Sequence, residues 1–323
     1  MADFWVHGVD GLDDDAANRL AAVHPDWRFT DGDVPPADAA YDVLVGGRPS
    51  LSLLTASKRL HTLVIPFAGV PAATSELLGA HPQIAVRPVH HTAGPTAELA
   101  LGLVLAAARA LVPADQAMRA GDWTPRFVPP TPTMILAGHP AVIVGYGEIG
   151  RRVARSLAAL DMEVHTIRGS ISSPYADGEV RVHPVGEFAE LAGCARVVVL
   201  AAPATARTAG LLSAEVISGL PTPSVVVNVA RAALVDERAL YERLLTGEIA
   251  AGLDVWWNEA SSADAATGIA ASAEPFHELP NVVLSPHRGG AFSLREVRDR
   301  RLAEVEKVLI TLAGARGVGS HGG

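Results

Sequence analysis

Three side chains in the second half of the chain have types that suit chemistry on a small organic acid. Arg231, Glu259 and His287 each come shortly after a short apolar run. A guanidinium holds a carboxylate through two parallel hydrogen bonds, and an imidazole gives or takes a proton near neutral pH. A carboxylate behind the imidazole fixes the ring and stabilises its protonated form. Together the three predict acid–base catalysis on an anionic substrate.

Strands must bring these residues together, because they are far apart along the chain. Valine-rich runs separated by helical stretches predict a parallel sheet that helices cover on both faces. Ligands of such sheets bind beyond the carboxyl ends of the strands, so we expect the three side chains to converge on one crevice there. The predicted strands are 141–144, 163–167, 196–201, 224–229, 249–255 and 281–284, and the helices between them are 148–160, 213–220 and 236–246.

A glycine-rich turn, Gly145-Tyr146-Gly147-Glu148-Ile149-Gly150, joins the first of these strands to the first helix. In that context Gly145 permits a tight turn, Gly147 lets a pyrophosphate approach the backbone, and Gly150 lets helix and strand pack closely. The free N–H groups of the helix N-terminus favour phosphate. The turn therefore predicts a doubly wound domain that binds a dinucleotide.

The residue after strand 163–167 bears on which dinucleotide binds. An acidic residue at this place binds the ribose 2′-hydroxyl of NAD, but here the residue is Arg168. A guanidinium instead neutralises a 2′-phosphate. The sequence thus favours NADP, with help from Ser170, and NAD remains the alternative if Arg168 is an ordinary solvated residue.

The ends of the chain show a second pattern of strands and helices. Strands are predicted at 4–7, 41–46 and 60–65, and helices at 14–23, 96–112 and 293–313, with Pro113 ending the long apolar helix 96–112. The Pro-rich segment 125–132 and the Ala/Ser-rich segment 261–273 are predicted to be loops, the second of them inserted at the surface.

Several segments in a fixed order resemble the D-isomer-specific 2-hydroxyacid dehydrogenase family. They are 67–70, 96–100, the glycine turn 145–150, 201–205 with Thr208, 228–236, 252–255 and 280–287. The resemblance implies an α/β protein with two doubly wound parallel-sheet domains. Residues 1–103 plus 292–323 would form a flavodoxin-like substrate (catalytic) domain, and residues 104–291 a Rossmann dinucleotide-binding domain. It also implies a homodimer.

The resemblance assigns a role to each candidate site residue. Arg231 would hold the substrate carboxylate and polarise the C2 oxygen, His287 would exchange a proton with that oxygen, and Glu259 would hydrogen-bond His287. The backbone N–H groups of Ala68 and Gly69 would help to bind the carboxylate. The predicted cofactor-binding residues are Tyr146, Gly147, Glu148, Ile149, Arg168, Ser170, Ala202, Pro203, Thr208, Val229, Ala230, Arg231, Asp254, His287 and Gly290, with Asp254 on the nicotinamide amide.

The expected reaction is NADP- or NAD-dependent interconversion of a small 2-oxo acid, such as glyoxylate or hydroxypyruvate, and its D-2-hydroxy acid. Two alternatives stand beside it. One is oxidation of formate or phosphite on the same scaffold, although formate enzymes of this family carry Gln where this chain has Glu259. The other is a dinucleotide-sensing regulatory protein without turnover, which has no need of an acid–base pair.

Composition excludes several other classes of protein. The chain has 323 residues, 49% of them hydrophobic and 19% charged, which excludes a disordered chain. Its net charge of −9 argues against a nucleic-acid partner, and no apolar stretch approaches the roughly 18 residues of a membrane span. No His, Cys or Asp cluster has metal-ligand spacing. A single cysteine and no visible signal peptide lead us to expect a cytoplasmic protein.

Overall fold

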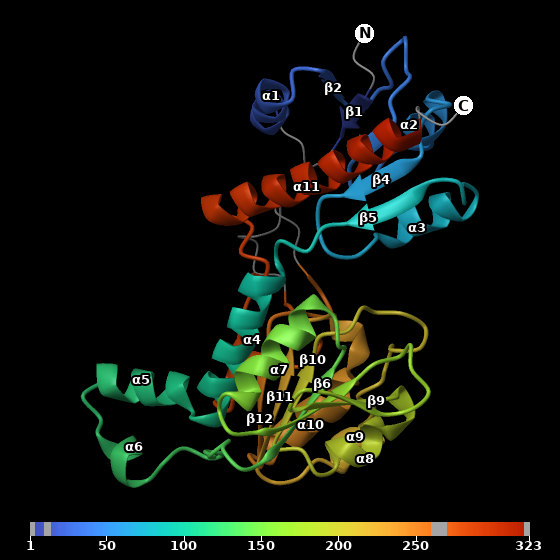
Figure 1. Ribbon diagram of the computed structural model, residues 1–323. Helices are drawn as coiled ribbons and strands as arrows, with labels where there is room; N and C mark the ends of the chain where they lie inside the picture. Colours follow the sequence, from blue (N-terminus) through green and yellow to red (C-terminus); the bar gives the residue numbers. More distant parts are fainter. Residues whose placement is uncertain (1–3, 10–13, 260–269, 320–323) are drawn as a thin grey trace. The chain divides into compact units, whose positions relative to one another are not determined.

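The computed structural model describes residues 4–9, 14–259 and 270–319 and divides into two compact units (Figure 1). The first unit comprises Met1–Thr92 and Phe292–Gly323, and the second comprises Ala93–Ala291. The sequence placed the boundary at residue 103, which lies inside α4 (Ala93–Ala108). That helix belongs as a whole to the second unit, so the observed boundary comes before it.

The first unit is built on a sheet of five parallel strands in the order β2-β1-β3-β4-β5. This is the flavodoxin-like order, which confirms the predicted class for this unit. Alternate residues of β1 face opposite layers, since Phe4 packs with α1 and α11 whereas Trp5 packs with α2. The elements are β1 (Phe4–Gly8), α1 (Asp14–Val23), β2 (Trp27–Asp31), β3 (Val43–Val45), α2 (Leu51–Ala56), β4 (Thr62–Ile65), α3 (Ala72–Gly79), β5 (Ala85–Pro88) and α11 (Arg295–Gly319).

The second unit contains an eight-stranded sheet in the order β13-β12-β11-β10-β6-β7-β9-β8, parallel except for β8. The order around β6 is that of a Rossmann domain, so the predicted class is confirmed here too. Its strands are β6 (Pro140–Val144), β7 (Glu163–Ile167), β8 (Tyr175–Asp177), β9 (Val180–His183), β10 (Val197–Leu200), β11 (Ser224–Asn228), β12 (Ile249–Leu253) and β13 (Val282–Leu284).

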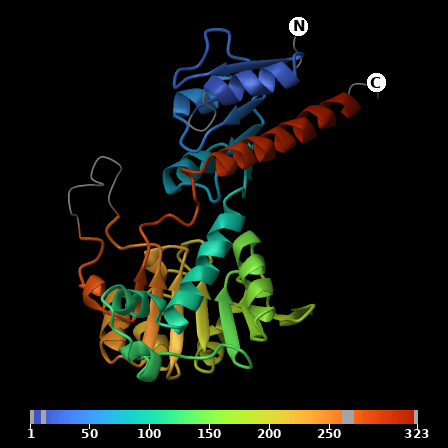
Figure 2. The same ribbon diagram turned by 90° about the vertical axis from the view of Figure 1, so that its left-hand side faces the viewer.

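Helices cover both faces of this sheet, as its Val-rich strands require. One core layer includes α4 and α7, and the opposite layer includes α8, α9 and α10 (Figures 1 and 2). The central strands β10 and β11 are fully buried. The remaining elements are α5 (Leu111–Arg119), α6 (Thr124–Phe127), α7 (Glu148–Ala158), η1 (Val185–Glu187), α8 (Phe188–Ala192), α9 (Ala214–Ser218), η2 (Ala232–Leu234), α10 (Glu237–Leu245) and η3 (Phe276–Glu278).

The predicted helix 96–112 was wrong at both ends. The structure has α4 and α5 in its place, separated at Ala110, whose backbone lies in the left-handed region with φ 47°. Pro113 does not end a helix but lies in the first turn of α5, where its missing N–H costs nothing. In the described part of the chain no single helix is long and apolar enough to cross a membrane. Only α4 and α5 taken together, bent by 67°, have the length and composition.

The structure tests one of the two segments that were predicted to be loops, 125–132, and describes little of the other, 261–273. The segment 125–132 is not wholly irregular, because its first residues belong to α6, which has Pro125 in its first turn. The Ala/Ser-rich segment 261–273 lies mostly outside the described residues, which resume at Ala270.

Substitution of Gly150 is expected to destabilise the second unit. A Cβ at this position would lie 1.8 Å from the carbonyl oxygen of Gly145, so the strand–turn–helix packing must shift. We expect Gly150→Ala to lower the free energy of unfolding by about 3 kcal/mol. Gly102→Ala is the matched control, because a Cβ there meets no atom within 4 Å and alanine favours the helix interior. Chemical denaturation measures both, and equal stability of the two variants would contradict this packing role.

Candidate functional site

The glycine turn combines tight backbone packing with one open position. The backbone of Gly145 has φ 105°, and a Cβ there would lie 2.7 Å from the carbonyl oxygen of Ala201. Gly147 caps the N-terminus of α7, and nothing lies within 4 Å of where its Cβ would be. The turn therefore leaves room at the positive end of an 11-residue helix, which fits the pyrophosphate of a dinucleotide. Glu148 and Ile149 form the first turn of that helix.

Tyr146 ties the glycine turn to the β8–β9 hairpin. Its hydroxyl donates to the Oδ2 atom of Asp177 at 2.8 Å, and the Arg151 guanidinium lies over its ring, 4.6 Å from the centroid. Burial, together with the hydrogen bond to Asp177, raises the pKa of Tyr146 to about 12. The phenol therefore remains a donor at physiological pH and fixes the hairpin beside the predicted dinucleotide site.

Arg168 and Ser170 lie where the sequence placed them, directly after β7. The Nε atom of Arg168 donates to Ser170 Oγ at 3.0 Å, and its Nη1 atom donates to the Tyr175 hydroxyl at 3.3 Å. No carboxylate among the described residues pairs with Arg168. The guanidinium is thus oriented by neutral groups and keeps its charge for an anion.

The loop after β10 carries three predicted cofactor-binding residues, Ala202, Pro203 and Thr208. Hydrogen bonds within the loop fix its shape, since Thr208 Oγ1 donates to the carbonyl oxygen of Pro203 at 2.7 Å and accepts from the backbone N–H of Thr205 at 2.8 Å. Ala202 is buried against the sheet. Their contact with a cofactor stays a prediction.

The three predicted catalytic residues follow three neighbouring strands. Arg231 comes after β11, Glu259 after β12 and His287 after β13. His287 Nδ1 lies 2.8 Å from Glu259 Oε1, so the expected hydrogen bond between these two is present. Both side chains are about two-fifths exposed, 42% for His287 and 40% for Glu259. With Nδ1 held by a carboxylate, Nε2 is the nitrogen left to exchange a proton with a substrate.

Arg231 is fixed at its backbone, and no hydrogen bond or ion pair of the described residues joins it to that pair. The buried Asn228 receives the Ala230 N–H at Oδ1 and donates through Nδ2 to the Arg231 carbonyl, both at 3.0 Å. Val229 and Ala230, which are predicted to bind the cofactor, complete this turn. In the described ranges no carboxylate lies within ion-pair distance of Arg231, whose Nη1 atom donates to the Ala230 carbonyl at 2.6 Å. The exposed guanidinium can therefore accept a substrate carboxylate.

Asp254 organises the loop that carries His287. Its carboxylate is buried, with 1% of the residue exposed. Oδ1 accepts the Ser285 hydroxyl at 2.5 Å and the Arg288 N–H at 2.9 Å, and Oδ2 accepts the Gly289 N–H at 2.9 Å. A Cβ on Gly289 would lie 2.7 Å from Oδ2, so only glycine admits this approach. These bonds engage both carboxylate oxygens, and the predicted contact of Asp254 with the nicotinamide amide stays a prediction.

His287 adopts an unusual backbone conformation within this loop, with φ 50°. A residue with a Cβ is uncommon in the left-handed region and is held there only by its surroundings. Trp256 contributes to both partners of the pair, because its Nε1 atom donates to the Ser285 carbonyl at 2.8 Å and its backbone N–H donates to Glu259 Oε1 at 3.3 Å. The sequence identified the pair, but not the supporting roles of Ser285 and Trp256.

The remaining predicted site residues are placed as follows. Ala68 and Gly69 lie in the loop after β4 of the first unit, and Gly69 has φ 84°. Gly290 follows the His287 loop and is half-buried. Within the described residues no group of three or more His, Cys, Asp and Glu side chains is arranged to hold a metal ion.

Comparisons with known proteins show the family and the fold of this chain. The model of the D-isomer specific 2-hydroxyacid dehydrogenase NAD-binding domain matches residues 101–289. D-3-phosphoglycerate dehydrogenase of Archaeoglobus fulgidus is 34% identical over 59% of this chain and 34% of its own length. Glyoxylate reductase of Thermococcus onnurineus is 35% identical over 61% of this chain and 57% of its own length. The matches thus span about a third to just over half of these relatives.

Solved structures share the fold over nearly the whole chain. A D-isomer specific 2-hydroxyacid dehydrogenase from Xanthobacter autotrophicus, in complex with NADPH and MES, has a TM-score of 0.74 at 24% identity and covers 96% of this chain and 95% of its own. D-lactate dehydrogenase from Aquifex aeolicus, complexed with NAD and lactic acid, has a TM-score of 0.71 at 18% identity and covers 96% of each chain. The chain belongs to the D-isomer specific 2-hydroxyacid dehydrogenase family, and residues 101–289 match its NAD-binding domain.

Because Asp254 holds the His287 loop, the isosteric substitution Asp254→Asn is expected to weaken that loop. In Asp254→Asn an amide NH₂ replaces one acceptor and faces an N–H or O–H donor, so a buried hydrogen bond is lost. We expect the free energy of unfolding to fall by about 1–3 kcal/mol and the amide hydrogens of Arg288 and Gly289 to exchange faster.

Asp236→Asn is the matched control for this change. Asp236 caps α10 by accepting the Ala239 N–H at 2.9 Å, and asparagine caps helices as well as aspartate does. Hydrogen exchange measured by mass spectrometry compares the two variants. If the amide hydrogens of residues 285–289 exchange no faster in Asp254→Asn than in the wild type, Asp254 does not hold this loop.

Proposed function

We propose that this protein catalyses the NAD(P)-dependent reduction of a small 2-oxo acid, of the glyoxylate or hydroxypyruvate type, to its D-2-hydroxy acid, and the reverse oxidation. The observation that carries the proposal is the 2.8 Å contact between His287 and Glu259 at the strand ends that also carry the unpaired Arg231. Similarity to curated glyoxylate reductases and D-3-phosphoglycerate dehydrogenases supports the same reaction class.

Each of the three side chains has one task in this reaction. When bound, the nicotinamide cofactor supplies or accepts the hydride at C2 of the substrate. Arg231 binds the substrate carboxylate and polarises the C2 oxygen. His287 donates a proton to that oxygen in reduction and removes it in oxidation. Glu259 holds the ring through Nδ1 and leaves Nε2 for the proton transfer.

The preferred cofactor in this proposal is NADP, on the strength of Arg168. This residue follows β7 in place of an acidic residue, and its guanidinium points to Ser170 and Tyr175. With no carboxylate of the described residues beside it, the end of β7 suits a 2′-phosphate better than a bare ribose hydroxyl. NAD is the alternative that the assays below distinguish.

Replacement of Arg231 or His287 tests the proposed reaction. We expect the wild-type protein to oxidise NADPH in the presence of glyoxylate, hydroxypyruvate or phosphohydroxypyruvate. Arg231→Ala and His287→Ala should each lower kcat/KM by about a hundredfold or more, because carboxylate binding and proton transfer are lost. Absorbance at the nicotinamide band measures turnover.

Arg238→Ala is the control, because it removes an exposed guanidinium that is paired with Glu242 on α10. Turnover retained in both site variants would refute the assignment. Turnover only with oxidised cofactor plus formate or phosphite would favour the alternative substrates. Cofactor binding without any turnover would favour a regulatory protein.

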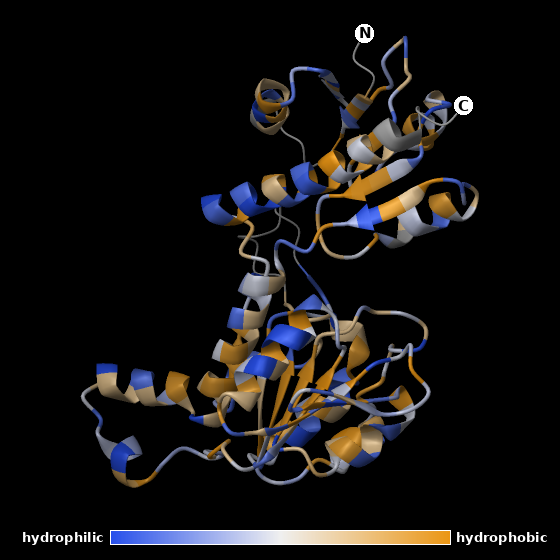
Figure 3. Ribbon diagram, viewed as in Figure 1, coloured by the Kyte–Doolittle hydropathy of each residue, from blue (hydrophilic) through white to orange (hydrophobic). Residues whose placement is uncertain are grey.

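We further propose that two copies of the chain associate through the segment 111–135. This segment includes α5 and α6, which project from the sheet of the second unit (Figure 1), and hydrophobic residues lie along it (Figure 3). Phe127 is 75% exposed and Ile135 72% exposed. Apolar side chains at this density on an extended arm indicate a surface that another protein covers.

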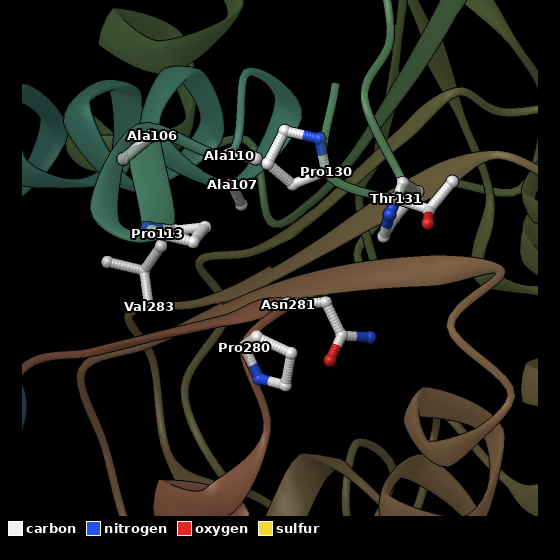
Figure 4. Close-up of a pocket in the computed structure, with 10 residues that line it drawn as sticks. Ala106, Ala107, Ala110, Pro113, Pro130, Thr131, Pro280, Asn281 and Val283 are labelled. Carbon is white, nitrogen blue, oxygen red and sulfur yellow. The ribbon is translucent and has the colours of Figure 1, made fainter. Parts of the chain in front are cut away.

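A hollow of about 210 Å³ at the foot of the same arm supports a second copy as the partner. Its lining is mostly apolar, from Ala107, Pro130 and Val283 among others (Figure 4). Asn281 also lines it, but its side-chain amide donates to the carbonyl groups of Leu244 and Ile249. An arm that offers apolar side chains and a hollow that accepts them on the same chain suit a two-fold symmetric contact.

Charge introduced on the arm is expected to separate the copies. The wild-type protein should sediment at twice its chain mass of 33.6 kDa, and Phe127→Glu/Val128→Glu should sediment as single chains, because buried carboxylates without partners are strongly unfavourable. Val34→Glu is the control, since Val34 is equally exposed in the first unit. A wild-type monomer, or a double variant that still sediments as a dimer, would contradict the proposal.

A further inference from the structure

Three loops of the second unit meet where the order of the strands reverses. Strand β6 has β10 on one side and β7 on the other, so the chain leaves β6 in one direction and later returns to its other side. The loops after β6, β7 and β10 therefore lie at neighbouring strand ends. In open α/β sheets this switch point is where a ligand binds.

Arg207 reaches across this point from the loop after β10. Its Nη1 atom lies 3.5 Å from the carbonyl oxygen of Gly169, the residue between Arg168 and Ser170 in the loop after β7. Two guanidinium groups from the loops after different strands thus lie at the same segment, residues 168–170. The sequence analysis identified Arg168 and Ser170 but gave no role to Arg207.

The β8–β9 hairpin also contacts the loop after β7. Tyr175, in β8, accepts from Arg168 Nη1 at 3.3 Å, and the backbone N–H of Arg168 donates to the His183 carbonyl of β9 at 2.9 Å. The hairpin is itself held to the glycine turn through Asp177 and Tyr146. Arg168 is therefore oriented before any ligand arrives, which lowers the entropic cost of binding.

Within the described residues, no carboxylate balances the guanidinium charges of Arg168 and Arg207. Asp177, the carboxylate of β8, is engaged by Tyr146 and lies 3.5 Å from Arg151. Across the described part of the chain neither Arg168 nor Arg207 has a carboxylate within 4.0 Å. Two like charges directed at one loop repel each other, and a doubly charged anion between them removes that repulsion.

We propose that Arg207 is a specificity-determining residue, the second guanidinium of a site for the 2′-phosphate of NADP, formed with Arg168, Ser170 and Tyr175. The inference rests on the proposed nicotinamide cofactor but not on any 2-oxo acid. Arg168 and Ser170 bind the phosphate from the β7 side, Tyr175 holds Arg168 in place, and Arg207 closes the site from the β10 side. Arg–phosphate contacts of this kind are charge-assisted and two-pronged.

Equilibrium binding of four nucleotides to the full chain tests this site. NADPH and NADH differ only in the 2′-phosphate, and 2′,5′-ADP and 5′-AMP carry the same difference without a pyrophosphate. We expect Arg207→Ala to weaken NADPH and 2′,5′-ADP by about tenfold or more, and to leave NADH and 5′-AMP within about twofold of the wild type. Tyr175→Phe should weaken the two 2′-phosphates by a smaller factor, about threefold.

Arg238→Ala serves as the charge-matched control, with no change expected for any of the four ligands. Equal weakening of NADPH and NADH by Arg207→Ala would assign this residue to the pyrophosphate and overturn the proposal. Wild-type affinity for NADPH in that variant, or a wild-type preference for NADH, would overturn it as well. Turnover plays no part in these titrations. A protein inactive on every 2-oxo acid would thus refute the proposed reaction while the phosphate site stands, and an active enzyme with equal affinities would refute the site alone.

Discussion

The hydrogen bonds to the buried carboxylate of Asp254 are the interaction on which the candidate site depends. A carboxylate removed from water is costly unless donors surround it, and here one hydroxyl and two backbone N–H groups of residues 285–289 do so. The same loop turns sharply at His287, whose φ of 50° lies outside the common range. The hydrogen bonds to Asp254 offset the cost of that backbone conformation. In this loop conformation the imidazole of His287 contacts Glu259. A single buried charge thus couples the stability of the unit to the geometry of its acid–base pair.

The parts of the fold that follow strong periodicity could be predicted from the sequence. The buried strands of the second unit were placed within one or two residues, because Val-rich runs between helical stretches have few other interpretations. The hairpin of β8 and β9 was missed. All three residues of β8 are exposed, so its sequence shows no alternation, and only pairing with β9 makes it a strand. The break between α4 and α5 was misplaced for a different reason. Pro113 was taken as the end of the helix, whereas the chain turns three residues earlier at Ala110, and no glycine marks that left-handed position.

Some residues of the candidate site could be predicted from the sequence, and others could be found only from their contacts in the structure. The family resemblance implied that Glu259 and His287 are partners, and they lie 2.8 Å apart. Asn228, which fixes the Arg231 turn, could have been recognised, since a polar residue that ends a buried strand needs hydrogen-bond partners. Arg207 carries no such signal. It is an exposed arginine in a polar loop, and its proximity to Gly169 depends on the neighbouring positions of β10, β6 and β7, which no local pattern encodes.

The arginines of the second unit differ in the groups that hold them. Arg181 pairs with Glu163 at 2.9 Å and Arg238 pairs with Glu242 at 2.8 Å, so each is largely neutralised and offers little to a ligand. Arg168 and Arg231 also lie at the surface, but neutral oxygens hold them. A hydroxyl or carbonyl acceptor fixes the direction of a guanidinium without cancelling its charge. An anion that reaches either one displaces no carboxylate of the described residues. The neutral acceptors of Arg168 and Arg231 are therefore consistent with the anion-binding roles that we propose for these two residues.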